Sequence, residues 1–233
     1  MRVELISVPY RYDEYNEGLG AGPSALIEAG IAARIARAGH EVGDVRTAHL
    51  PEEEREPGQL GVNIGRLGAE TAALVAAARR QGAAAFALAG DDTASIGVAA
   101  GLEMAHGAAS RIGVVWLDAH GDFNTPETSY SGILAGMPVA ILAGLAAPRW
   151  RAAAGLSEPV PPSRMLLAGV RELDDKESSL LKEHQVSVVT TDKVRAGLEF
   201  ENAVSRLAEQ SDVLLLHVDL DVLDPHLVPS AST

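Results

Sequence analysis

Three side chains with metal-binding chemistry directly follow one apolar segment of the sequence. The segment RIGVVWL, residues 111–117, is typical of a buried strand, and it runs into Asp118, His120 and Asp122 at every second position. Because side chains alternate across a strand, we expect these three groups to leave on one face and to lie close together. Two carboxylates and an imidazole at that spacing are costly unless a cation lies between them. The pattern therefore predicts a cation site at the end of this strand.

Two further apolar runs end in aspartates. FALAGDD ends in Asp91 and Asp92, and LLLHVDLDVLD carries Asp219, Asp221 and Asp224. A single Asp after a strand is usually a helix cap or a turn residue, and the cluster after residue 117 taken alone could be a hydrogen-bonded polar loop. Three such clusters at the carboxyl ends of parallel strands favour a ligand site instead. Paired carboxylates with one imidazole suit two hard divalent ions about 3.5–4 Å apart.

Short β-rich runs alternate with Ala-rich segments of helical period along the chain. We expect strands at residues 3–8, 42–47, 83–89, 112–118, 165–170, 186–190 and 213–219, and helices at residues 23–38, 64–80, 95–106, 175–184 and 200–210. This alternation predicts an α/β fold with right-handed crossovers and a mostly parallel, doubly wound sheet. The least regular stretch, residues 147–163, is interpreted as a surface excursion rather than a domain boundary. Residues 1–233 are therefore predicted to form a single domain.

The composition excludes several classes of partner and site. The chain has 32 acidic and 19 basic residues, a net charge of −13, and this charge would repel nucleic acid and anionic membranes. There is no cysteine, so any metal must be held by oxygen and nitrogen ligands. The N-terminus has no secretory signal pattern, and no apolar run approaches about 18 residues. We expect a cytoplasmic protein that binds neither nucleic acid nor membrane, and a homo-oligomer is left open.

The aspartate motifs resemble those of the ureohydrolases, the family of arginase, agmatinase and formiminoglutamase. DAHGDFNTPETSYSG, residues 118–132, resembles the family's Asp-Ala-His-x-Asp signature and the substrate loop after it. HVDLDVLDP, residues 217–225, resembles the signature Ser-x-Asp-x-Asp-x-x-Asp-Pro, and AGDDTASIG, residues 89–97, resembles an altered Gly-Gly-Asp-His-Ser. The resemblance implies a three-layer α/β/α, arginase-like fold, a site for two manganese ions and a small-molecule guanidino substrate.

The resemblance also assigns a role to each metal-site residue. It implies that Asp118 and Asp219 bridge two Mn²⁺ ions, that His120 and Asp221 complete the shell of one ion, and that Asp122 and Asp92 complete the other. The ions would activate a water that attacks the guanidino carbon, and Asp122 is the candidate for the proton relay to the leaving amine. On this basis the expected activity is that of a metal-dependent amidinohydrolase, which cleaves a C–N bond of a linear amidine.

Three positions depart from the family pattern. Asp92 stands where the family has a histidine ligand, and its extra negative charge is expected to raise the pKa of the activated water. In SGILAGMP, residues 131–138, Ile133 and Ala135 stand where arginases have Asn and a His that transfers protons. Alanine cannot transfer a proton, so the expectation of ordinary arginase turnover is weakened. A metal-binding homologue with little or no activity is therefore the alternative, as is a hydrolase of the agmatinase or formiminoglutamase type.

The substrate loop favours an α-amino-acid substrate such as arginine or Nω-hydroxyarginine. The resemblance places Asn124, Ser129 and Ser131 at the substrate's α-carboxylate and Asp174 at its α-amine, with Glu177 assisting. Each has a plain alternative, because Asn124 and Ser129 are also common turn formers and Asp174 could cap a helix. The sequence also stops before a further strand and helix that the family has, so the predicted fold is apparently incomplete at its C-terminus.

Overall fold

A computed structural model describes residues 1–228 of the 233-residue chain, and the last five residues lie outside the described part. The chain divides into two compact units. Unit 1 comprises Met1–Ala109 and Ala147–Ser157, and unit 2 comprises Ser110–Ala146 together with the chain from Glu158 onward. The prediction of a single domain over residues 1–233 stays a prediction.

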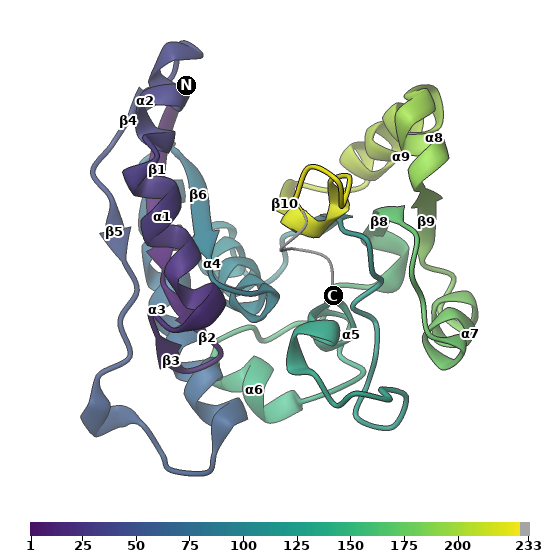
Figure 1. Ribbon diagram of the computed structural model, residues 1–233, viewed down its shortest axis with the longest axis horizontal. Coiled ribbons are helices and arrows are strands. Elements are labelled where there is room, and N and C mark those ends of the chain that lie inside the picture. The colour runs from purple at the N-terminus through teal and green to yellow at the C-terminus, as the bar shows by residue number, and fades with distance from the viewer. Residues whose placement is uncertain (229–233) are drawn as a thin grey trace. The chain divides into compact units, whose positions relative to one another are not determined.

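Unit 1 is built on a small parallel sheet. Its central strand β1 (Arg2–Val8) pairs on one side with the short strands β4 (Glu41–Val42) and β5 (Arg46–Thr47), and on the other with β6 (Ala84–Ala89). A two-stranded antiparallel ribbon, β2 (Tyr10–Arg11) and β3 (Glu14–Tyr15), follows β1. The α-helices of the unit, shown with the strands in Figure 1, are α1 (Gly22–Glu28), α2 (Ile31–Arg37), α3 (Leu60–Arg80), α4 (Ser95–His106) and α6 (Pro148–Ala153).

Glycines allow α3 and α4 to pack closely inside unit 1. A Cβ atom placed on Gly97 of α4 would lie 2.5 Å from the backbone oxygen of Gly68 of α3. One turn further along α4, a Cβ on Gly101 would lie 2.7 Å from the backbone oxygen of Ala72. Neither distance is compatible with a larger side chain, so both positions require glycine for the approach of the two helices. This pairing fixes α4, which follows the Asp91–Asp92 motif in the sequence.

Unit 2 is a second parallel sheet, with the strand order β10 (Val213–Val218), β7 (Ile112–Leu117), β8 (Met165–Val170) and β9 (Ser187–Thr190). Its α-helices are α5 (Pro138–Leu142), α7 (Asp175–Glu183), α8 (Thr191–Ala196) and α9 (Leu198–Glu209). A core cluster forms where Ala203 and Leu207 of α9 pack against Val115, Leu166 and Val189 of the sheet. Apolar side chains of β7, β8 and β9 therefore form the inside of this unit, as the alternation of strands and helices predicts.

Two predicted elements are divided in the structure. The helix predicted over residues 23–38 is two helices, because Gly30 adopts a left-handed conformation (φ = 82°) between α1 and α2. The strand predicted over residues 42–47 is the separate pair β4 and β5. Between them, Gly43 lies against the buried carboxylate of Glu4, and a Cβ there would come within 2.5 Å of Glu4 Oε2. The left-handed backbone at Gly30 thus divides the predicted helix, and Gly43 lies where the predicted strand is interrupted.

The interpretation of residues 147–163 as a surface excursion is wrong in part. The helix α6 forms there and packs against α3, and Trp150 is 3% exposed. The stretch is held against the protein by its apolar side chains, although its prolines suggested a surface loop. Trp150, Ala154, Leu156 and Val160 are all buried. A short helix, α8, also forms at residues 191–196, where no element was predicted.

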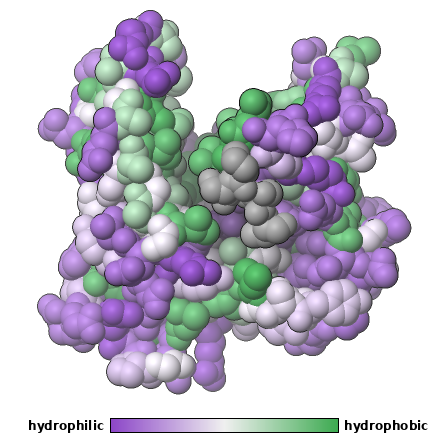
Figure 2. All heavy atoms as spheres, viewed as in Figure 1, coloured by the Kyte–Doolittle hydropathy of each residue, from purple (hydrophilic) through white to green (hydrophobic). Residues whose placement is uncertain are grey.

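The outer strand β10 exposes apolar side chains. Leu214, Leu216 and Val218 alternate along one face of the strand and are 37%, 64% and 53% exposed, whereas Leu215 on the other face is 4% exposed. Figure 2 shows hydrophobic surface over the β10 segment. β10 pairs with β7 on one edge, and no described strand pairs with its other edge. Among the described residues, no helix is long and apolar enough to cross a membrane.

Candidate metal centre

Two adjacent strands of unit 2 bring the second and third aspartate motifs together. β7 and β10 run parallel, with His217 opposite Trp116 and Val218 opposite Leu117. Each strand therefore ends at the same level, and the backbone N–H of Asp219 donates to the Leu117 oxygen at 2.9 Å. The expectation that the motifs after these two strands meet at one edge of a parallel sheet is confirmed.

Asp118, His120 and Asp221 form a compact group with metal-binding chemistry. His120 Nδ1 lies 2.9 Å from Asp221 Oδ2 and 3.4 Å from Asp118 Oδ1. Each residue offers one ligand atom, and these atoms all lie within 4.8 Å of one another. The side chains of Asp118 and Asp221 are 1% and 11% exposed, while that of His120 is 36% exposed. The group is thus lined by buried carboxylates and reached from solvent at the imidazole.

Hydrogen bonds hold both carboxylates in place. Asp118 Oδ1 accepts the backbone N–H of His120 at 2.7 Å, and Asp118 Oδ2 accepts the indole N–H of Trp116 at 3.1 Å. Asp221 Oδ1 accepts the backbone N–H of Ala119 at 3.0 Å. Each oxygen has a second lone pair, so these bonds orient the carboxylates and still leave acceptor capacity for a cation.

The electrostatics of the group favour a positive charge at its centre. Hydrogen bonds to Asp118 and Asp221 raise the pKa of His120 to about 10, because both carboxylates stabilise the imidazolium. The same imidazole lowers the pKa of Asp221, against the effect of its burial. The charge that the two carboxylates favour at this position could come from a proton on His120 or from a metal ion.

The residues fit a divalent ion that prefers oxygen and nitrogen ligands. Neighbouring ligands at about 2.1 Å from an octahedral ion lie about 3.0 Å apart. The separations of His120 Nδ1 from the two carboxylates, 2.9 and 3.4 Å, are close to this value. Carboxylate oxygens with an imidazole nitrogen form a donor set that suits Mn²⁺.

The alternation that predicted one shared face for Asp118, His120 and Asp122 does not continue past the strand. β7 ends at Leu117, and the residues after it form a loop. Asp122 has a left-handed backbone (φ = 47°) and is 5% exposed, and its backbone oxygen accepts the N–H of Val139 at 3.0 Å. A loop backbone, rather than a strand, therefore sets the direction of this side chain, and its role as a ligand and proton relay stays a prediction.

Asp219 and Asp92 occupy strand ends as expected, but their metal roles stay predictions. Asp219 begins the short 3₁₀ helix at Leu220–Val222, where its carboxylate accepts the N–H of Asp221 at 2.8 Å. It thereby holds the backbone at Asp221. Asp92 belongs to unit 1, where it begins the 3₁₀ helix Asp92–Ala94 after β6. Its neighbour Asp91 caps that helix, and burial raises the pKa of the Asp91 carboxyl.

The substrate-loop residues divide into two groups. Asn124 Nδ2 donates to Asp174 Oδ2 at 3.5 Å, and Glu177 Oε1 accepts the N–H of Phe123 at 2.9 Å, so α7 is tied to the loop after Asp122. Asp174 stands at the N-cap position of α7 but its side chain makes no cap hydrogen bond. Ser129 and Ser131, in contrast, accept the N–H groups of Gly132 and Ile133, as turn formers do.

Glu177 is a buried carboxylate beside the loop that carries His120 and Asp122. It is 3% exposed, and burial raises the pKa of its carboxyl. Its Oε1 atom leaves no room for a side chain at position 121, because a Cβ on Gly121 would lie 2.8 Å from it. Glu177 thus fixes the path of the chain between His120 and Phe123. Its contact with substrate stays a prediction.

Trp116 and His217 are site residues that the sequence analysis missed. Their rings stack at a centroid distance of 3.5 Å and an interplanar angle of 9°, and Trp116 Nε1 and His217 Nε2 lie 3.1 and 4.0 Å from Asp118 Oδ2. The signal was present in the sequence, because Trp116 and His217 each precede an Asp by two positions at the end of a strand. The alternation of side chains along a strand places such residues on the face of the following Asp.

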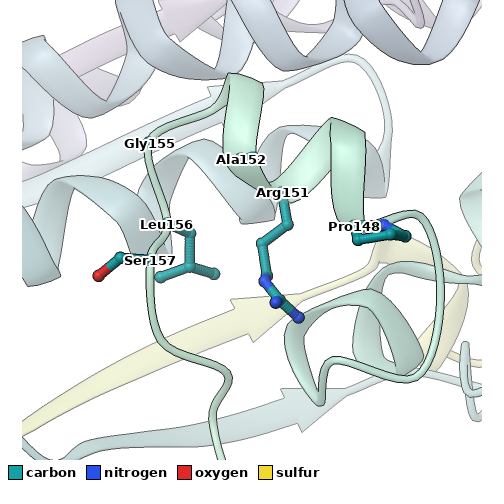
Figure 3. A pocket seen from close by; sticks show the side chains of 6 residues that line it. All are labelled: Pro148, Arg151, Ala152, Gly155, Leu156 and Ser157. Atoms are coloured by element: carbon teal, nitrogen blue, oxygen red, sulfur yellow. The ribbon is translucent and has the colours of Figure 1, made fainter.

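One pocket of unit 1 is lined by residues 148–157, which include none of the site residues named above. It is lined by Pro148, Arg151, Ala152, Gly155, Leu156 and Ser157, around the end of α6 (Figure 3). None of the predicted metal or substrate residues lines this pocket. The chemistry suggested by the aspartate motifs therefore does not concern it.

The comparisons with known proteins agree with this geometry. A model of the Arginase family matches residues 1–233. The arginase of Bacillus caldovelox is 34% identical over 240 residues, which cover 99% of this chain and 79% of that protein, and the arginase of Brevibacillus brevis is 30% identical with the same coverage. The crystal structure of arginase from Bacillus cereus is similar with a TM-score of 0.83 and 29% identity, covering 98% of this chain and 78% of that one.

The similarity is therefore not limited to the motifs. The alignments cover nearly the whole chain, and the fold is similar as well. The α/β architecture with parallel sheets is that of the arginase structures. Because the family model matches the chain along all of residues 1–233 and a relative is 34% identical to it, the chain belongs to the arginase family.

Proposed function

We propose that this protein is a binuclear manganese amidinohydrolase that acts on the guanidino group of arginine or a close analogue such as Nω-hydroxyarginine. As a member of the arginase family, it is a hydrolase of C–N bonds in linear amidines. The observation that carries the proposal is the group of Asp118, His120 and Asp221, because its donor set and spacing fit a metal ion. The name of the relatives supports a guanidino substrate.

Mn²⁺ ions held by Asp118, His120, Asp122, Asp219 and Asp221 of unit 2 would supply a Lewis acid that makes water nucleophilic near neutral pH. The side chains of this chain then have distinct tasks. Trp116 and the backbone of His120 hold the Asp118 carboxylate, and the N–H of Ala119 holds that of Asp221. Preorganised ligands of this kind need little rearrangement during the reaction.

The reaction adds water to the guanidino carbon and breaks its bond to the side-chain nitrogen. One product is urea, or hydroxyurea from the hydroxylated substrate, and the other is the amine. The proton removed from water must reach the leaving nitrogen, and Asp122 is proposed to carry it. Ala135 supplies no second proton carrier, so a substrate with a less basic guanidine is favoured.

An α-amino-acid head group is proposed to contact the loop that starts at Asn124. Asp174 would pair with the α-ammonium, and its contact with Asn124 supports a shared position for these two side chains. A charge-assisted contact contributes about 1.5–3 kcal/mol, so arginine or Nω-hydroxyarginine should be preferred over agmatine by roughly tenfold or more.

Release of urea and hydroxyurea from the manganese-loaded protein tests this proposal. We expect product from arginine or Nω-hydroxyarginine, at least about tenfold less from agmatine in kcat/KM, and none from any substrate with Asp118→Asn. Asp212→Asn is the matched control, because Asp212 is an exposed partner of Arg111 at the other end of β10 and should retain activity. Equal use of agmatine would refute the substrate assignment, and a manganese-loaded protein without product would favour a metal-binding homologue.

The missing proton carrier gives a second test. Ala135→His should raise the turnover of arginine, because a positioned acid or base contributes about 10²–10⁴-fold, and Nω-hydroxyarginine should gain less. Ala135 lies in the 3₁₀ helix Leu134–Gly136 and is half-buried, so a larger side chain can be placed there. Gly136→Ala is the control for a change in loop structure. If Ala135→His turns over arginine at the same rate as wild type, the role given to this position is contradicted.

A further inference from the structure

His217 lies beside the proposed metal centre, on the same face of β10 as the aspartate that follows it. Leu215, His217 and Asp219 alternate on one face, and Leu215 is buried while the opposite face is exposed. The side chain of His217 is 12% exposed, and its Nε2 atom lies 4.0 Å from Asp118 Oδ2. The imidazole is therefore directed toward a proposed ligand rather than into an apolar core.

The ring of His217 is held in a fixed plane. It stacks on Trp116 at 3.5 Å with an angle of 9°, and the two residues are register partners on adjacent strands. Trp116 in turn donates its indole N–H to Asp118 Oδ2. The same indole thus orients both the imidazole and the carboxylate, and a fixed ring orientation is what a metal-ligating histidine requires.

We propose that His217 is an additional nitrogen ligand of the metal ion held by Asp118, an assignment that rests on the proposed metal-dependent function. Two ligands at about 2.1 Å from one ion can lie at most about 4.2 Å apart, so the 4.0 Å between His217 Nε2 and Asp118 Oδ2 is within the span of one ion. A carboxylate oxygen has two lone pairs, so accepting the Trp116 N–H does not by itself prevent Asp118 Oδ2 from binding an ion.

The sequence gives a chemical reason for a histidine at this position. In the motifs that resemble the ureohydrolase signatures, Asp92 replaces a histidine and His217 replaces a serine. The motifs therefore contain as many imidazoles as the family pattern, with one of them moved to β10. A neutral imidazole binds a divalent ion without adding to the negative charge of the aspartates.

Pulsed electron paramagnetic resonance of the manganese-loaded protein tests the assignment without relying on activity. Nitrogen ligands couple to the electron spin of Mn²⁺, so wild type should show couplings from two imidazoles. His217→Ala and His120→Ala should each remove one coupling and weaken manganese binding at least about tenfold. His106→Ala is the matched control, because His106 is exposed at the end of α4 in unit 1, and it should leave both couplings in place.

His217→Gln separates a ligand from a hydrogen-bond donor. Glutamine retains an N–H donor but no imidazole nitrogen, so it should lose the coupling as His217→Ala does. If His217→Ala loses its fold, as judged by circular dichroism, the glutamine variant provides the measurement. Unchanged nitrogen couplings in a folded His217 variant would overturn the assignment while leaving the proposed function intact. Wild type that binds no manganese would overturn both.

Discussion

Trp116 is the side chain on which the geometry of the proposed metal centre depends most. It is fully buried, it donates to Asp118 Oδ2, and its ring supports His217. A residue that orients a ligand typically changes metal affinity by about 10–100-fold when it is replaced. An indole can thus control metal binding without touching the ion.

Replacing the two tryptophans of the chain separates this effect from general packing. Trp116→Phe keeps an aromatic ring but removes the N–H donor, so manganese affinity measured by calorimetry should fall by about 10–100-fold. Trp150→Phe is the control, because Trp150 is equally buried, and its Nε1 atom has no hydrogen-bond partner within the described structure. Equal manganese affinities of the two variants would contradict the role given to Trp116.

His120 gives the metal-free protein a specific dependence on pH. Its pKa is raised to about 10 by Asp118 and Asp221, from an unfolded value near 6.5. A raised pKa means that the imidazolium stabilises the folded state fully below about pH 6.5 and that this contribution is lost as the pH rises through about 10. The difference in unfolding free energy between wild type and His120→Ala should therefore shrink over that range.

Denaturant unfolding of the chelator-treated protein at several pH values measures this difference. His106→Ala, an exposed histidine of unit 1 for which no carboxylate partner is described, should show no such trend. A difference that grows between pH 6.5 and 10 would mean that the imidazolium is not stabilised by its two neighbours. With manganese bound, the trend should disappear, because ligation needs the neutral imidazole.

The sequence predicts which side chains form the central group of the proposed metal centre but not their arrangement. Asp118, His120 and Asp221 could be found because they follow apolar strands at fixed spacing, and the structure groups them. The direction of Asp122 could not, because a left-handed loop residue sets it. Trp116 was read only as part of an apolar strand, since its hydrogen bond to Asp118 depends on atoms that hydropathy does not distinguish.

At the scale of elements, β10 has two faces with opposite roles. Leu215 is 4% exposed and packs inward, whereas Leu216 is 64% exposed. Leu215→Ala should lower the unfolding free energy by about 2–5 kcal/mol, and Leu216→Ala should change it by only about 0.5 kcal/mol or less. Urea titrations followed by circular dichroism measure both. Similar losses for the two variants would show that the outer face of β10 is covered in solution.

Most elements could be predicted because their hydropathy period is regular. The helix at residues 95–106 and the strand at residues 165–170 have the predicted bounds. The errors lie where a single residue decides the backbone. Gly30 divides one predicted helix, Gly43 beside Glu4 lies between the two short strands that replace one predicted strand, and the buried Trp150 lies in a proline-rich stretch that belongs to unit 1.

At the scale of the whole molecule, metal binding should stabilise the folded chain. A ligand that binds only the folded state adds about 2.7 kcal/mol when its concentration is 100 times Kd. Thermal unfolding should therefore shift to higher temperature with added Mn²⁺ in wild type and in Asp212→Asn, but not in Asp118→Asn. An equal shift in Asp118→Asn would mean that manganese stabilises the chain from another site.

The charge of the whole chain is consistent with this dependence on cations. A net charge of −13 includes a group of aspartates held near one another at the ends of β7 and β10, and a bound cation relieves their repulsion. The α/β class and the family could be predicted from the sequence because motif order and strand alternation are properties of the entire chain. The division into two compact units could not, because it depends on contacts between distant segments.

The central claim is that the ends of β7 and β10 hold manganese, and an anomalous difference map from crystals grown with Mn²⁺ tests it most directly. The account predicts a peak within coordination distance of Asp118, His120 and Asp221, with His217 Nε2 as a further ligand of an ion that Asp118 binds. Crystals of Asp118→Asn should lack that peak, while those of Asp212→Asn should keep it. A well-ordered wild-type structure in manganese without a peak at Asp118 would contradict the account.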